Sequence, residues 1–130
     1  MTTLTEQLHD EQAYLTDLRR TFHQHPELGL KEYWTAERIE QELDALGIPH
    51  ERIGETGVLG LIEGQREGDG TIALRADIDG LPVQETNDVP YRSQNDGVMH
   101  ACGHDSHIAV LLGAAKVLHY ARGSFGGRIK

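Results

Sequence analysis

The hydrophobic residues in the first part of the chain recur at helical spacing. Leu15, Leu18 and Phe22 follow an i, i+3, i+7 pattern. This pattern predicts one helix with an apolar face, running from about residue 4 to His23. Pro26 cannot continue a helix, so the segment from His23 onward is predicted to be a loop that contains two histidines.

The same periodicity predicts a second helix, which begins near residues 33–35. Ile39, Leu43 and Leu46 share one face of it. Gly47 is the expected left-handed cap, and a proline follows two residues later. Each of the two helices would therefore offer an apolar face to a common core.

Shorter apolar stretches in the middle of the chain predict β-strands. The three segments are residues 50–53, 57–63 and 71–76. The last of them is apolar almost throughout, which predicts a strand buried on both faces that delivers Asp77 and Asp79 to its carboxyl end. The glycine-rich residues 64–70 are predicted to be a flexible hairpin connection. The pattern favours an α/β fold.

The last part of the chain combines an irregular stretch with a long apolar helix. Residues 81–100 show no periodicity and contain proline, asparagine and glycine, which predicts a loop. The Ala- and Leu-rich run after it predicts a buried helix with Asp105 or Ser106 as its N-cap and an end near Arg122. Residues 128–130 resemble the opening of another strand. Because such a strand would lack its neighbours, the chain is expected to be a piece of something longer.

Composition limits the classes of function. The chain has 130 residues, enough for at most one domain, and its hydrophobic fraction of 38% is not that of a disordered chain. A net charge of −9 argues against a nucleic-acid or anionic membrane surface. A single cysteine excludes an internal disulfide and fits a reducing compartment. Neither a signal peptide nor a stretch of the ~20 apolar residues that span a bilayer is visible, so a cytoplasmic location is expected.

The nine residues from Met99 to His107 concentrate the candidate chemistry. They hold the only cysteine, three of the eight histidines and one acid. Cys102 and His104 are two residues apart, so in an extended loop both side chains would face one site. Thiolate and imidazole together suit zinc, cobalt or nickel, although two ligands alone complete no zinc site. The alternative is a buried cysteine beside solvated histidines, but the density of ligand types favours half of a metal site.

Three motifs carry a resemblance to a known family. They are Arg19–Gly29 (RRTFHQHPELG), Leu74–Pro82 (LRADIDGLP) and His100–His107 (HACGHDSH). Together and in this order they resemble the M20 metallopeptidase family, and more narrowly its amidohydrolase branch of N-acyl-amino-acid, hippurate and auxin-conjugate hydrolases. The resemblance implies an α/β catalytic domain with a mixed sheet flanked by helices. Residues 1–130 would be its N-terminal metal-binding half, without the lid domain.

The resemblance also implies roles for individual residues. Family members hold two divalent metal ions (Mn, Zn, Co or Ni) that share a bridging ligand. Cys102 would be that bridge, and His104 would bind one of the metals. Asp79 would orient the site, as metal-bound histidines generally require. Asp77 matches a position where other branches carry a metal-binding histidine, and it is not predicted to be a ligand. Substrate contact or support of the ligands is the weaker expectation for His100, Asp105 and His107.

The resemblance further implies what the 130 residues lack. The family's general base, its next metal ligand, two further histidine ligands and the lid domain all follow later. The expected function is therefore the N-terminal fragment of a dinuclear amidohydrolase that cleaves the amide bond of N-acyl amino acids and is inactive alone. Its partners would be small-molecule substrates, with neither nucleic acid nor membrane, and longer family members are often homo-oligomers. The alternative is a truncated, non-catalytic metal-binding protein, or a subunit completed by a second chain.

Overall fold

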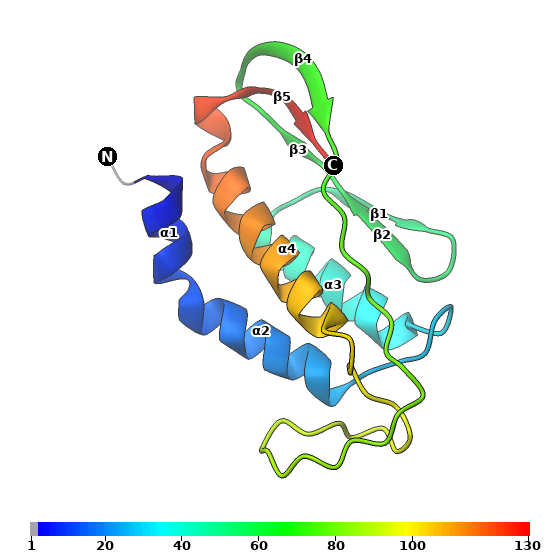
Figure 1. Cartoon of the computed structure of the whole chain (residues 1–130). Coiled ribbons are helices and arrows are strands. Elements are labelled where there is room, and N and C mark those ends of the chain that lie inside the picture. The colour runs from blue at the N-terminus through cyan, green and yellow to red at the C-terminus, as the bar shows by residue number, and fades with distance from the viewer. Residues whose placement is uncertain (1–2) are drawn as a thin grey trace.

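Helix α4 (His104–Tyr120) runs through the middle of the computed structural model, which describes residues 3–130 (Figure 1). Helices α2 (Gln12–Gln24) and α3 (Tyr33–Leu46) pack on either side of it, and the short α1 (Leu4–Asp10) lies beside it. The apolar faces of these helices meet in one core. Its buried members are Leu18, Phe22, Ile39, Leu43, Ile48, Ile62, Ile108, Ala109 and Leu112.

The single N-terminal helix predicted by the periodicity is wrong, because two helices meet at Glu11. A capping box between Thr3 and Glu6 begins α1. Glu11 then leaves the helical conformation, and its carboxylate pairs with Lys116 of α4 at 2.5 Å. This ion pair holds the break against the central helix. His23, predicted to begin a loop, instead lies in the last turn of α2 and is buried.

Helix α3 confirms the second predicted helix. It ends at Leu46, and Gly47 caps it in the left-handed conformation with a φ of 73°. Ile39 and Leu43 are buried in the core, as their spacing indicates.

Two small sheets complete the fold, one beyond the C-terminal end of α4 and one beside α3 (Figure 1). Strand β1 (His50–Ile53) pairs antiparallel with β2 (Gly57–Gly60). The other sheet has the order β3-β5-β4, with an antiparallel β3–β5 pair and a parallel β4–β5 pair. Its strands are β3 (Ile62–Glu63), β4 (Arg66–Ile72) and β5 (Gly126–Ile129). The mixed α/β fold is therefore confirmed, although the strand predicted over residues 57–63 divides at Leu61 between the two sheets.

The prediction of a doubly buried strand over residues 71–76 is wrong, and so is the hairpin connection over residues 64–70. Strand β4 occupies most of the predicted connection and is exposed along its whole length. After Ile72 the chain is extended but has no strand assignment. The amide of Leu74 donates to the carbonyl of Lys130, which continues the pairing of this segment with β5.

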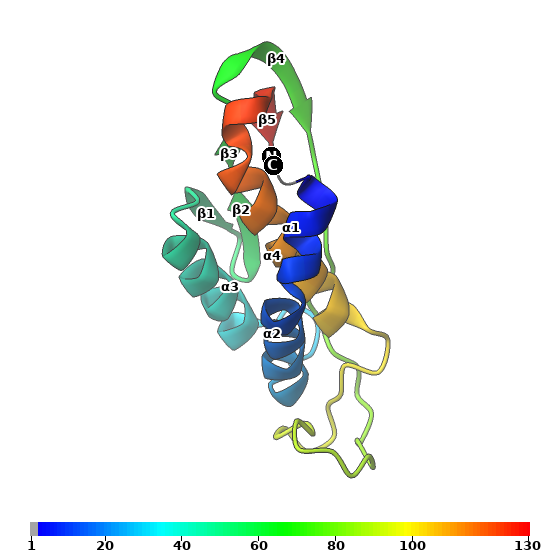
Figure 2. The same cartoon turned by 90° about the vertical axis from the view of Figure 1, so that its left-hand side faces the viewer.

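The extended segment that follows β4 runs alongside α4 toward the N-terminal end of that helix (Figures 1 and 2). Leu74, Ala76 and Ile78 line an apolar groove of about 370 Å³ between this segment, α3 and α4. The intervening aspartates contact His104 instead. The alternation explains why an apolar sequence is only partly buried here.

Helix α4 begins two or three residues earlier than predicted. Its N-cap is Gly103, with a φ of 88° and no side-chain cap hydrogen bond, rather than Asp105 or Ser106. This left-handed residue turns the backbone between Cys102 and His104, so the expectation of an extended loop carrying both side chains is also wrong. The helix ends at Tyr120, and a 3₁₀ turn follows over Arg122–Ser124.

The irregular segment over residues 81–100 is confirmed, with a single bridge between Leu81 and Met99. It lies below the C-terminal end of α2 and the N-terminal end of α4 (Figure 2). Among residues 3–130, no helix has both the length and the apolar character needed to cross a membrane.

Candidate metal centre

The His104 side chain is held in place by Asp79. Its Nδ1 lies 2.8 Å from the carboxylate Oδ1 of Asp79 and 3.1 Å from the backbone carbonyl oxygen of the same residue. Both oxygens only accept hydrogen bonds, so Nδ1 is the donor. When the ring is neutral, its lone pair is therefore on Nε2. A carboxylate behind one ring nitrogen is the usual support of a metal-binding histidine.

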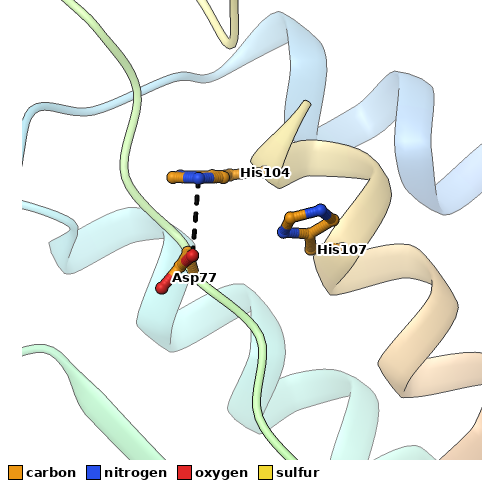
Figure 3. A group of neighbouring side chains, drawn as sticks. All are labelled: Asp77, His104 and His107. Carbon is orange, nitrogen blue, oxygen red and sulfur yellow. Dashed lines mark ion pairs between the residues drawn. The ribbon is translucent and has the colours of Figure 1, made fainter. Parts of the chain in front are cut away.

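Two further side chains approach His104 (Figure 3). Its Nε2 lies 3.5 Å from Oδ2 of Asp77, and the ring of His107, one turn along α4, has its centroid 5.3 Å from that of His104. One ligand atom from each of the three residues lies within 4.8 Å of the others. Two tetrahedral ligands at about 2.1 Å from one ion are about 3.4 Å apart. The 3.5 Å between Asp77 and His104 matches this separation, and Asp77, His104 and His107 are therefore candidate ligands of a divalent ion.

Asp77 was not predicted to be a ligand, yet its side chain is the nearest carboxylate to the free nitrogen of His104. Its other oxygen, Oδ1, pairs with Arg75 at 2.5 Å. The sequence does indicate this arrangement, because residues i and i+2 of an extended segment, here Asp77 and Asp79, face the same side.

Cys102 lies apart from this three-residue group. Its side chain is exposed, and the left-handed Gly103 separates it from His104. Its role as a bridging ligand stays a prediction.

His100 is a buried histidine beside the site. Neither of its ring nitrogens has a hydrogen-bond partner within residues 3–130. Burial lowers the pKa of His100 and outweighs the opposing charge of Asp105, which favours the neutral ring. A neutral imidazole keeps one unprotonated nitrogen, so the predicted support role remains chemically open to it.

Asp105 is fully buried and engaged on the α2 side of the site. Its Oδ2 lies 2.9 Å from Nε of Arg19 and 2.8 Å from Nδ1 of His23, and its Oδ1 accepts from the amide of Ser106. These contacts favour support of the neighbouring His104 over contact with a substrate.

Glu85 is a buried acid that the sequence analysis does not select. Both of its carboxylate oxygens lie 3.0 Å from Nε2 of His23. Burial raises the pKa of Glu85, but hydrogen bonds from His23, the Ser93 amide and Asn87 outweigh it and lower the pKa to about 2. The i, i+4 spacing of Arg19 and His23 places only those two side chains on one face of α2, and no spacing in the sequence points to Glu85.

A family model described as peptidase family M20/M25/M40 matches residues 73–130, which include Asp77, Asp79 and His104. A Bacillus subtilis protein named as an amidohydrolase, YhaA, is 50% identical over 114 residues, which are 87% of this chain and 28% of that protein. A hydrolase of Staphylococcus aureus strain USA300 is 53% identical over 103 residues, 79% of this chain and 26% of its own length. The chain belongs to the M20 peptidase family.

Two solved structures resemble this chain over nearly its whole length. The Bacillus subtilis YXEP protein, described as a dinuclear metal binding peptidase from the M20 family, superimposes with a TM-score of 0.85 at 40% identity. The match covers 90% of this chain and 33% of that one. A structure described as an aminohydrolase from methicillin-resistant Staphylococcus aureus superimposes with a TM-score of 0.91 at 38% identity. The match covers 97% of this chain and 34% of that one. This M20 chain thus spans about a quarter to a third of the length of these proteins.

Proposed function

We propose that this chain is the N-terminal, metal-binding part of a dinuclear amidohydrolase that hydrolyses the amide bond of N-acyl amino acids. The observation that carries the proposal is His104, whose Nδ1 is fixed by Asp79 while its Nε2 faces Asp77. The name of the YhaA relative supports amide hydrolysis, and the description of the YXEP protein supports two metal ions. The choice of N-acyl amino acids rests on the motif resemblance.

A bound pair of divalent ions supplies a Lewis acid for the amide carbonyl and lowers the pKa of a water molecule. The residues of this chain prepare the site. Asp79 accepts a hydrogen bond from Nδ1 of His104, which leaves the Nε2 lone pair available to a metal ion. Asp77 places a negative charge beside Nε2 of His104. Cys102 would hold the ions as a shared thiolate ligand.

The Cys102→Ser variant is expected to lose more metal affinity than His107→Ala. A serine hydroxyl is neutral and a poor bridge between two cations, whereas His107 is proposed to support the site rather than bind the ions. Calorimetric titration with Zn²⁺ or Co²⁺ measures both affinities. Equal affinities would remove Cys102 from the ligand set, and a larger loss in His107→Ala would assign the ion to the group of Asp77, His104 and His107.

The 130-residue chain is expected to release no amino acid from N-acetyl or N-benzoyl amino acids in the presence of Mn²⁺, Co²⁺ or Zn²⁺. Hydrolysis needs a general base, and the family resemblance puts that base after residue 130. Chromatography of the products is the measurement. Metal-dependent turnover by this chain would contradict the proposal of an inactive fragment.

The polypeptide recovered from its natural source tests the substrate class. The proposal expects an intact mass well above 14.4 kDa and metal-dependent hydrolysis of N-acyl amino acids. A longer protein that binds metal but cleaves only other amides would contradict the substrate class alone. A mass of 14.4 kDa without turnover would favour the second candidate, a metal-binding subunit completed by another chain, to which the open apolar groove beside α4 points.

A further inference from the structure

His23 lies between two buried carboxylates. Its Nδ1 is 2.8 Å from Oδ2 of Asp105, and its Nε2 is 3.0 Å from both oxygens of Glu85. The side chains of His23, Asp105 and Glu85 are 3%, 0% and 1% exposed, respectively. The three residues come from α2, α4 and the irregular segment, so one ring joins three separate parts of the chain.

The partners of His23 determine its protonation. A neutral imidazole donates from one nitrogen only. The lone pair of its other nitrogen would then face the lone pairs of a carboxylate oxygen, which repel it. Hydrogen bonds at both nitrogens therefore require the doubly protonated ring. Arg19 adds a second cation on Asp105, so two cations balance two carboxylates in the buried cluster.

The cluster connects the two walls of the metal centre. One wall is the start of α4, where Asp105 directly follows His104. The other wall is the extended segment with Asp77 and Asp79, which continues into the segment that contains Glu85. Ser93 and Asn87 donate to the Glu85 carboxylate, and Arg92 donates to its backbone carbonyl, which anchors this segment at the same point.

We propose that His23 is a positioning residue: as an imidazolium it clamps Asp105 to Glu85, and so fixes His104 against the Asp77–Asp79 segment. Within this protein the clamp stands behind the metal centre and touches none of the three grouped ligand atoms. Its effect on metal affinity rests on the proposed function, whereas its effect on the position of the His104 ring does not.

The first measurement uses the wild-type, metal-free chain. Proton–nitrogen NMR of the histidine rings at pH 7 is expected to show two ring N–H signals for His23, because both nitrogens are hydrogen-bonded and shielded from solvent. Disappearance of these signals in the variants below assigns them. A single N–H signal for His23 would overturn the imidazolium clamp.

Two variants each retain half of the clamp. In His23→Asn the amide nitrogen replaces Nδ1 and can still donate to Asp105, and in His23→Gln it replaces Nε2 and can still donate to Glu85. Each is expected to shift or broaden the His104 Nδ1–H signal. Each is also expected to weaken Co²⁺ binding by about 10-fold, the lower end of the effect of losing a residue that supports a ligand.

His25→Gln is the matched control. His25 lies one residue past α2 and is half-buried; its Nδ1 donates to the Thr21 carbonyl, and its ring stacks on Trp34. It contacts neither Asp105 nor Glu85 by any hydrogen bond found in residues 3–130. This variant is expected to leave the His104 signal and the Co²⁺ absorption spectrum unchanged.

The outcomes separate the clamp from the proposed function. Folded His23 variants with a wild-type His104 signal would overturn the clamp, even where Co²⁺ binds normally. A chain that binds no Co²⁺ but whose His104 signal responds to the His23 variants would support the clamp and contradict the metal-binding function. Should both His23 variants fail to fold, Glu85→Gln removes one charge and keeps an acceptor. It is expected to displace the His104 signal less strongly, and an unchanged signal would overturn the clamp.

Discussion

Metal affinity is expected to be almost abolished in the His104→Ala variant. His104 belongs to both ligand sets under consideration, the pair with Cys102 and the group with Asp77 and His107. Its removal should therefore cost more than the roughly 10- to 100-fold loss that follows removal of a supporting residue. Competition between the protein and a chelator for Zn²⁺ or Co²⁺ measures the change.

The Asp79→Asn variant separates ligand from support in the same experiment. Asparagine can still accept from Nδ1 of His104 but carries no charge, so affinity should fall by roughly 10- to 100-fold and less than in His104→Ala. His9→Ala, an exposed histidine on α1, is the control for general loss of imidazole and should bind like wild type. Wild-type affinity in His104→Ala would contradict the proposed centre altogether.

Local patterns predicted the parts of the fold that depend on local physics. Helix α3 and its glycine cap follow directly from periodicity and from the backbone freedom of Gly47. The long α4 follows from an uninterrupted apolar run, although the true N-cap is Gly103. These features need no knowledge of distant residues.

The wrong predictions concern segments whose structure depends on a partner. Residues 71–76 have the apolar composition of a buried strand, but a strand also needs a neighbour, and among the described residues only Thr71, Ile72 and Leu74 of this stretch pair with residues 128–130. The glycine-rich stretch before it pairs with β5 and so becomes part of β4 rather than a free connection. Composition alone does not specify which strand edge is available for pairing.

The same distinction applies to the site. The motif resemblance selected His104 and Asp79, which the structure brings together, because both lie in short motifs with a known spacing. Glu85 and His23 are 62 residues apart in the chain, and no spacing rule connects them. The buried charge cluster is a property of the folded packing of α2 against α4 and the irregular segment.

Stability of the chain is expected to fall with pH through the titration of Glu85. The pKa of this carboxyl is lowered from 4.5 to about 2 in the folded protein, because its hydrogen bonds outweigh burial. A lowered pKa means that the unfolded chain binds the proton first as pH falls. The stabilisation is therefore complete above pH 4.5 and is lost between pH 4.5 and about 2. At about 1.4 kcal/mol per pKa unit, this corresponds to roughly 3 kcal/mol.

Replacement of Glu85 tests whether this carboxylate causes the acid dependence of stability. Glu85→Ala leaves the His23 imidazolium buried beside an empty space and is expected to cost about 3–5 kcal/mol at pH 7, the usual penalty for breaking a buried ion pair. Glu85→Gln should cost less and should remove most of the acid dependence between pH 4.5 and 2. Urea unfolding at a series of pH values measures both. The control is Glu37→Gln, an exposed acid on α3, which should keep the wild-type acid dependence. A Glu85→Gln curve parallel to wild type would show that acid lability originates elsewhere, and that Glu85 is not the residue through which α2 and the irregular segment are held together.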